Sequence, residues 1–225
     1  MRRTWFFAVV TFACGCGSRE EAPAPQPAAS TAPAPSSPAP AADTRPAIVC
    51  FGNSITAGFG LEPGEGFPEL LQKDLDRRGL TYQVVNMGVS GDTTQDGLSR
   101  LSLALDEKPA IAILELGAND GLRGVPADII QANLSRMIEA FQSAGARVIL
   151  AGMTLPPNYG RQYIARFDTI YRELAAKYRI TLIPFLLEGV GGHSDLMQKD
   201  GLHPNAAGAR RVEALVMRSL DVSLR

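Results

Sequence analysis

The sequence predicts an α/β domain in which a parallel sheet of five strands lies between two layers of helices, a three-layer α/β/α sandwich. From residue 46 to residue 225, short apolar runs alternate with stretches of helical periodicity. The runs are apolar throughout, which is typical of strands that helices cover on both faces. For five such strand–helix units we expect a flavodoxin-like strand order, 2-1-3-4-5.

The expected strands are the five short apolar runs that lie between the helical stretches. They cover residues 47–51, 82–86, 110–116, 147–152 and 180–184. Runs of this length are typical of buried strands. We therefore expect a polar, functional segment directly after several of them, because ligands of such sheets bind at the carboxyl ends of the strands.

The expected helices follow from the spacing of apolar residues and from helix-ending signals. Within 67–78 three leucines fall on one face, and the same holds within 94–105. The stretch 126–143 begins with a proline, a favoured first helical residue, and Gly145 ends it. Two further helices, over 161–178 and 204–220, complete the set.

Residues 1–16 predict an export signal, of the lipoprotein type. Arg2 and Arg3 precede a run of ten mostly apolar residues that is too short to span a bilayer. Cys14 and Cys16 each follow a small residue, so both are candidates for lipidation. Neither has the leucine that is usual three residues before such a cysteine. Cleavage as a plain secreted protein is the alternative.

Residues 17–45 predict a disordered linker rich in alanine and proline. The segment contains no Val, Ile, Leu, Met, Phe, Trp or Tyr, and 16 of its 29 residues are Ala or Pro. It therefore has nothing to bury that would offset the entropy lost on ordering. With the leader, it predicts a folded domain, 46–225, that is exported to the periplasm or cell envelope and held at a membrane by a lipid anchor.

The charge balance and the few histidines exclude two classes of protein. The chain has 22 Lys+Arg and 23 Asp+Glu, a net charge of −1, whereas a polybasic nucleic-acid binder would carry a clear cationic excess. Only two histidines, His193 and His203, are present, so a histidine-rich metal cage is excluded. We expect neither a metal nor another cofactor.

Four polar, glycine-rich segments follow expected strands or precede the last helix. They are 52–58 (GNSITAG), 86–93 (NMGVSGDT), 117–121 (GANDG) and 200–204 (DGLHP). Because the carboxyl ends of parallel strands meet at one edge of a sheet, we expect these segments to converge there.

Together these segments contain the groups that acyl transfer requires. The Ser54 hydroxyl becomes a nucleophile when a base takes its proton, and His203 is the candidate base. Asp200, three residues before His203, can orient the imidazole through one tight turn. The oxyanion of the intermediate needs hydrogen-bond donors, for which the N–H of Ser54, the N–H of Gly91 and the amide of Asn119 are candidates.

Four blocks in this order make the sequence resemble the SGNH (GDSL-like) hydrolases, most of all the branch of thioesterase I/lysophospholipase L1 and bacterial arylesterases. The blocks are GNSITAG at 52–58, NMGVSGDT at 86–93, LGANDGLRG at 116–124 and DGLHPN at 200–205. The resemblance covers nearly all of residues 47–222. It implies the SGNH hydrolase fold, with Ser54, Asp200 and His203 as catalytic residues and Gly91 as the oxyanion glycine.

Some residues depart from the family pattern or lie outside its four blocks. The family usually has Asp where this chain has Asn53, and we expect altered hydrogen bonding in the loop rather than lost activity. Asp120, Arg123, Asn158 and Tyr159 are expected to line the acyl or leaving-group pocket. For two remaining residues we expect no functional role. His193 is expected to be a solvated loop residue, and Cys50 a residue of the core.

The predicted function is cofactor-free hydrolysis of carboxylic esters or thioesters through an acyl-enzyme at Ser54. Its substrates would be small esters or lysolipids, and the sequence leaves the oligomeric state open. One alternative is a flavodoxin-like module that binds a phosphate or flavin at the loop after the first strand, without hydrolysis. Another is a metal-dependent hydrolase built from His193, Asp195, Asp200 and His203. An inactive envelope scaffold is a third.

Overall fold

The structure is a computed structural model that describes residues 43–223. The predicted leader 1–16, with Cys14 and Cys16, and the predicted linker up to residue 42 lie outside the described residues. Among residues 43–223, no helix combines the length and the apolar character needed to cross a membrane.

In the described residues, five parallel strands form one sheet in the order β2-β1-β3-β4-β5, which confirms the predicted order. The strands are β1 (Ala47–Gly52), β2 (Gln83–Gly88), β3 (Ile111–Glu115), β4 (Arg147–Ala151) and β5 (Thr181–Ile183). Every residue of β1 and β3 is buried, whereas β2 is partly exposed because it lies at the edge of the sheet.

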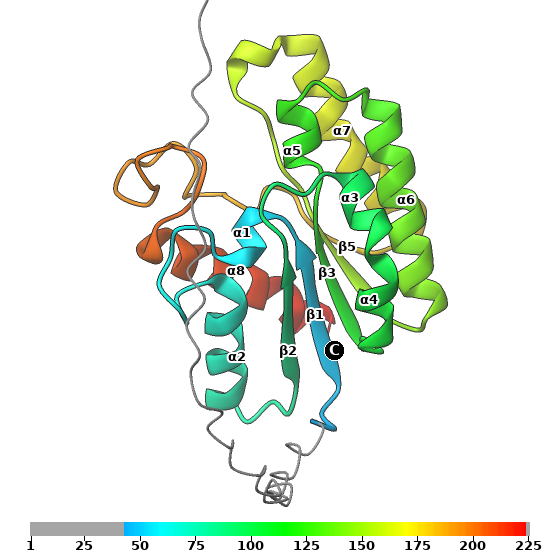
Figure 1. Cartoon of the computed structure of the whole chain (residues 1–225), viewed down its shortest axis with the longest axis vertical. Helices are drawn as coiled ribbons and strands as arrows, with labels where there is room; N and C mark the ends of the chain where they lie inside the picture. Colours follow the sequence, from blue (N-terminus) through cyan, green and yellow to red (C-terminus); the bar gives the residue numbers. More distant parts are fainter. Residues whose placement is uncertain (1–42, 224–225) are drawn as a thin grey trace, which may run out of the picture. The chain divides into compact units, whose positions relative to one another are not determined.

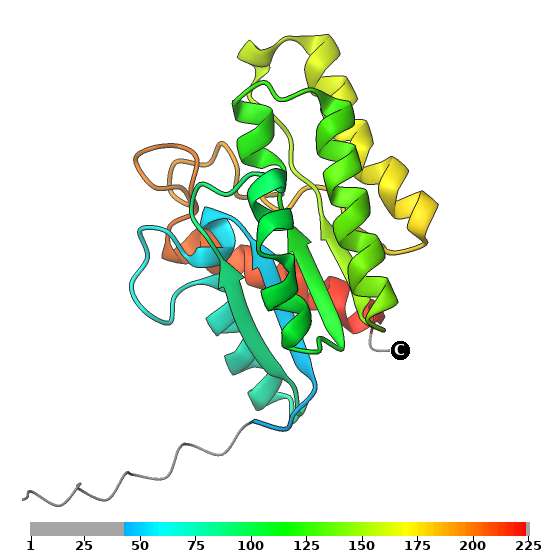
Figure 2. The ribbon, with the colours of Figure 1, turned by 45° about the vertical axis from the view of Figure 1, so that its right-hand side comes forward.

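Helices cover both faces of this sheet (Figures 1 and 2). On one face α2 (Phe67–Arg77) packs against α8 (Ala206–Ser223). On the other face lie α3 (Thr94–Ser99), α4 (Leu101–Asp106), α6 (Ala127–Ser143) and α7 (Arg161–Tyr178). The three-layer α/β/α sandwich is thus confirmed. Cys50 is fully buried in β1, and burial raises the pKa of its thiol well above the usual range.

The structure differs from the sequence prediction in the helix expected over 94–105. It divides into α3 and α4 at Arg100, whose backbone leaves the helical region with φ −113° and ψ 10°. The Arg100 side chain turns inward and donates to three oxygen atoms at or near the ends of β1 and β2. These hydrogen bonds to other parts of the chain outweigh the local helical pattern.

Short helical turns also replace some segments expected as loops. They are α1 (Ser54–Ala57) directly after β1, α5 (Ala118–Leu122) after β3, and a 3₁₀ turn, η1 (Pro157–Tyr159), before α7. The connection that leaves β1 runs to β2, whereas the connection that leaves the neighbouring strand β3 runs to β4, in the opposite direction along the sheet. The crevice that this reversal creates at the carboxyl ends of the strands is where ligands of such sheets bind, and α1 lies there (Figure 1).

Candidate active site

Ser54 begins α1 directly after the end of the interior strand β1, and it is only 9% exposed. The Asn53 side chain caps this helix by accepting a hydrogen bond from the Ile55 N–H at 3.1 Å. Gly58 ends the helix in the left-handed conformation, φ 74°. The nucleophile candidate therefore lies at the N-terminus of a capped turn rather than on a free loop.

The structure brings Ser54, His203 and Asp200 into one hydrogen-bonded chain. His203 Nε2 lies 2.8 Å from Ser54 Oγ, and His203 Nδ1 lies 2.7 Å from Asp200 Oδ2. The other oxygen of Asp200 accepts from the N–H groups of Leu202 and His203, which closes a tight turn. The hydrogen bond from His203 lowers the pKa of Asp200 to about 2. An ionised Asp200 fixes the proton on Nδ1 and leaves Nε2 free to accept the serine proton.

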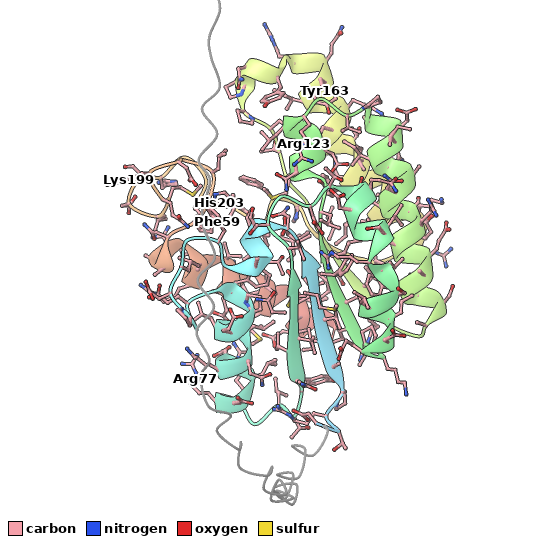
Figure 3. The ribbon with its side chains drawn as sticks, viewed as in Figure 1. Phe59, Arg77, Arg123, Tyr163, Lys199 and His203 are labelled. Atoms are coloured by element: carbon pink, nitrogen blue, oxygen red, sulfur yellow. The ribbon has the colours of Figure 1, made fainter. Side chains whose placement is uncertain are left out.

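Two residues, Phe59 and Gln198, hold the loop that carries His203. The ring of Phe59 packs on the imidazole with a centroid distance of 4.7 Å (Figure 3). Gln198 Nε2 donates to the carbonyl oxygens of Phe59 and Pro204, and the Gln198 N–H donates to His203 O. The segment after α1 thus supports the histidine directly.

Ser54 and Asn119, which carry two of the three candidate oxyanion donors, line the same cavity. The Asn119 amide donates one of its two hydrogens to Asp92 O at 2.8 Å, and its second N–H is a further donor. Gly91 has φ 89°, a conformation that favours glycine, and a Cβ added there would meet no atom within 4 Å. Backbone conformation, not lack of space, is therefore what requires glycine at this position. The Arg123 side chain donates to Gly91 O.

A cavity of about 470 Å³ opens beside Ser54. Its polar end carries Ser54, Asn119 and His203. The rest is mostly apolar and includes Leu122, Met153, Leu155, Phe185, Leu187 and Met197. This size and this composition suit an apolar small-molecule group with a polar reacting end.

The structure corrects the expectation for Asp120, which is 1% exposed and does not line this cavity. Its carboxylate instead accepts hydrogen bonds from the N–H and the hydroxyl of Thr94, so it joins α5 to the start of α3. Burial raises its pKa, and the hydrogen bonds from Thr94 oppose that effect.

Arg123, Asn158 and Tyr159 are also outside the cavity lining. Arg123 contacts the Gly91 carbonyl, and the Tyr159 hydroxyl donates to Leu122 O at 2.9 Å. Asn158 is exposed. The cavity is lined instead by residues close to them in the sequence, namely Leu122, Pro156 and Pro157. Arg123 and Tyr159 thus support the segments around the cavity rather than facing its interior.

An ion pair that was not predicted from the sequence lies beneath the site. Arg100 Nε lies 2.6 Å from Asp92 Oδ2, and the two side chains are only 15% and 11% exposed. The same guanidinium donates to Met87 O at 2.8 Å and to Gly52 O at 2.9 Å, and it stacks over the Phe51 ring. Arg100 thus ties the ends of β1 and β2 to the loop whose Asp92 carbonyl contacts Asn119. A charged residue within an apolar helical pattern was the one signal of such a contact.

A buried carboxylate, Glu115, also contacts the Ser54 turn and was not singled out in the sequence. It is fully buried and accepts hydrogen bonds from both nitrogens of Asn53 and from the Thr56 hydroxyl. The altered hydrogen bonding that we expected at Asn53 is therefore a hydrogen bond from its side-chain amide to the Glu115 carboxylate. The remaining histidine, His193, is exposed and is not part of the cavity lining.

A serine, a histidine and a carboxylate joined in a chain, with amide donors around the serine, define a hydrolase that works through a serine nucleophile. The profile of the GDSL-like Lipase/Acylhydrolase family matches residues 50–211. The chain belongs to this family, and it is a hydrolase that acts on ester bonds. This membership argues against the flavin-binding alternative. Among residues 43–223, no group of three or more His, Cys, Asp or Glu is arranged to hold a metal ion.

Similar proteins include several esterases. The chain is 46% identical over 166 residues to Esterase TesA of Pseudomonas aeruginosa, covering 73% of this chain and 83% of that protein. It is 38% identical over 166 residues to Thioesterase 1/protease 1/lysophospholipase L1 of Escherichia coli K12, covering 73% and 77%. It also resembles the psychrotrophic esterase EstA from Pseudoalteromonas sp., in a structure inhibited by monoethylphosphonate, with TM-score 0.76, 34% identity and coverage of 79% and 98%.

Proposed function

We propose that Ser54, His203 and Asp200 hydrolyse carboxylic esters or thioesters by way of an acyl-enzyme. The observation that carries this proposal is the unbroken hydrogen-bonded chain from Ser54 Oγ through His203 to Asp200. In the first step Ser54 Oγ bonds to the carbonyl carbon while its proton passes to His203 Nε2. The imidazolium then delivers that proton to the leaving alcohol or thiol as its bond to the carbonyl carbon breaks.

The second half of the reaction reverses these proton movements. Water loses a proton to His203 Nε2 and attacks the acyl carbon. The proton returns to Ser54 Oγ as the carboxylic acid leaves. In both halves the N–H of Ser54, the N–H of Gly91 and the free N–H of Asn119 stabilise the oxyanion, each by roughly 3 kcal/mol.

The cavity supports a substrate with an apolar acyl group. Leucine, methionine and phenylalanine side chains surround most of the 470 Å³ beside Ser54, so transfer of an acyl chain from water into it is favourable. Lysophospholipids and other carboxylic esters with apolar acyl chains are the substrates we propose. The lysophospholipase activity that the name of the Escherichia coli relative gives supports the same class.

We further propose that the protein is exported to the periplasm or cell envelope and anchored there by a lipid on Cys14 or Cys16. The leader and the linker of residues 1–45 support this placement. It favours lysophospholipids over acyl-coenzyme A, which is a cytosolic metabolite. Fractionation of cells, compared between Cys14→Ala and Cys16→Ala, tests the anchor: the variant that loses membrane association identifies the lipidated residue. Association retained by both single variants and by the double variant contradicts it.

Labelling with a fluorophosphonate followed by peptide mapping tests the nucleophile directly. The reagent reacts with serine hydroxyls that a base activates, so the label is expected on the peptide that contains Ser54. His203→Ala removes the base and should prevent labelling, whereas the exposed His193→Ala is the matched control and should label normally. A label on another serine, such as Ser90, would overturn the assignment.

A further inference from the structure

Glu115, the last residue of β3, occupies the interior directly beneath the Ser54 turn. It is fully buried, and each of its carboxylate oxygens accepts from that turn. Oε1 accepts from Asn53 Nδ2 at 2.7 Å, and Oε2 accepts from the Asn53 N–H at 3.1 Å and from the Thr56 hydroxyl at 2.8 Å. These donors are all neutral groups from residues on either side of Ser54.

The amide of Asn53 has a fixed orientation, because both of its ends are engaged. Its nitrogen donates to Glu115, while its oxygen accepts from the Ile55 N–H at 3.1 Å and lies 3.4 Å from Ser54 Oγ. A reversed amide would point its oxygen at the carboxylate and its nitrogen at the Ile55 N–H. Both new contacts would be repulsive, so Glu115 determines which way Asn53 faces.

The end of β1 packs directly against the carboxylate of Glu115. A Cβ added to Gly52 would lie 2.6 Å from Glu115 Oε2 and 2.1 Å from Thr56 Oγ1. The end of β1 therefore approaches the carboxylate so closely that only glycine fits. Displacement of the carboxylate would transmit to Asn53 and Thr56, and through them to Ser54.

We propose that Glu115 is a positioning residue for catalysis, which holds Ser54 at its distance from His203 through a donor–acceptor match with the Asn53 amide. This inference rests on the proposed role of Ser54 as the nucleophile. It predicts that the rate of acyl transfer depends on the pairing of a donor at one of these two positions with an acceptor at the other, rather than on either residue alone.

The ionisation of Glu115 supports this coupling. Burial raises its pKa to about 7, while the hydrogen bonds from Thr56 and Asn53 oppose that rise. Tyr171 of α7 is a titratable group that interacts electrostatically with the Glu115 carboxylate. Its hydroxyl donates a hydrogen bond to Leu116 O. Protonation turns an acceptor oxygen into a donor that faces Asn53 or Thr56, so the match is weakened in acid.

An exchange of donor and acceptor between the two positions tests the proposal. Asn53→Asp sets two carboxylates against each other, and Glu115→Gln sets two amides against each other with no arrangement that satisfies all three donors. The double variant reverses the pair, because the new amide at position 115 would donate to a carboxylate at position 53 that still accepts from the Ile55 N–H. Glu115→Gln is expected to lower kcat by about 10- to 100-fold with KM changed less than about twofold. In Asn53→Asp one of the two facing carboxyl groups holds a proton and so supplies a donor. Its kcat should therefore fall mainly as pH rises and that proton is lost. The double variant is expected to regain most of that loss.

The measurements are kcat and KM on a p-nitrophenyl ester from about pH 5 to pH 9, with thermal unfolding to confirm the fold. Glu107→Gln, which removes an exposed carboxylate, is the matched control and should behave like the unsubstituted protein. The double variant should also lose the part of the acid limb of the kcat profile that belongs to Glu115. Wild-type kcat in both folded single variants, or losses in the double variant that simply multiply, would overturn the proposal.

Two further variants keep the test decisive. If Glu115→Gln does not fold, Thr56→Val serves in its place, because it removes one donor from the same carboxylate. The kcat of Thr56→Val should fall several-fold. An unchanged kcat at every pH in both Thr56→Val and Asn53→Asp overturns the inference.

Ser54→Ala separates the two proposals. If Ser54→Ala retains full activity, the nucleophile assignment fails, whereas an inactive Ser54→Ala beside fully active Asn53 and Glu115 variants refutes the positioning role alone.

Discussion

Ser54 and His203 lie 2.8 Å apart, yet they belong to regions that are held in place in different ways. The nucleophile region, residues 52–56, is buried throughout and is anchored from below by Glu115 and Arg100. The base region, residues 198–204, is largely exposed: the Asp200 side chain is 37% exposed and that of His203 is 19% exposed. Its anchors are mostly contacts within the loop and with Phe59.

Because one region is buried and the other exposed, we expect substitutions in the two regions to affect stability and activity differently. Contacts in the nucleophile region are part of the core, so their loss leaves buried polar groups without partners and costs folding free energy as well as rate. Contacts in the base region are near solvent, where water replaces a lost partner at little cost. Substitutions there should reduce activity while the protein remains folded.

Ser54→Ala is expected to lower kcat on a p-nitrophenyl ester by at least about 10⁴-fold, because no nucleophile remains. The hydroxyl makes no hydrogen bond to the anchoring groups Glu115 and Arg100, so the unfolding midpoint in urea should change little. A variant that unfolds much more easily would show that the nucleophile also supports the core. Full activity would contradict its assignment.

Asp200→Asn is expected to lower kcat by about 10³- to 10⁴-fold, since an amide no longer holds the proton on His203 Nδ1. Because Asp200 is near solvent, thermal unfolding should shift by only a few degrees. Asp195→Asn, an exposed residue of the same loop, is the control. A large loss of stability in Asp200→Asn would show that the base region, like the nucleophile region, supports the folded core.

Arg100→Met is expected to lower the free energy of unfolding by about 3 to 5 kcal/mol, because it leaves the Asp92 carboxylate buried without its ion-pair partner. The Asp92 loop should also move, with a loss of kcat. Arg77→Met, whose side chain is 73% exposed, is the matched control and should cost no more than about 1 kcal/mol. Urea titrations of both variants give the comparison, and equal effects would refute the anchoring role of Arg100.

The pH dependence of stability should carry the signature of Glu115. Its pKa is raised from 4.5 to about 7 in the folded protein, so the unfolded chain releases this proton first as pH rises. Between these pH values the contribution of Glu115 lowers the free energy of unfolding as pH rises, by about 3 kcal/mol in total. Glu115→Gln should remove that slope. Asp200 does not interfere, because its lowered pKa affects stability only below about pH 4.

Phe59→Ala is expected to have the smallest effect, a loss of about 3- to 10-fold in kcat. The ring supports the His203 imidazole by packing, and such aromatic contacts are worth about 0.5 to 1.5 kcal/mol. Phe59→Leu, which keeps an apolar group there, should lose less. An unchanged rate in Phe59→Ala would show that Gln198 and the Asp200 turn hold the histidine without help.

The sequence was enough to predict the alternation of strands and helices and the residues that meet at the crevice. Both depend on local signals: apolar runs of strand length, glycine-rich segments directly after them, and an Asp and a His three residues apart that one turn can join. Parallel strands bring such segments to one edge whatever the details of their packing, which is why Ser54, Asn119 and His203 could be grouped before any coordinates were considered.

The tertiary structure alone decided which polar residues turn inward. Asp120 follows the same glycine-rich pattern as Asn119 but is buried against Thr94, and Arg100 interrupts a helix that its neighbours favour. Glu115 ends an apolar strand, and nothing nearby in the chain shows that Asn53 and Thr56 donate to it. Burial and hydrogen-bond partners of this kind join segments tens of residues apart, and the free energy they contribute depends on how whole elements pack.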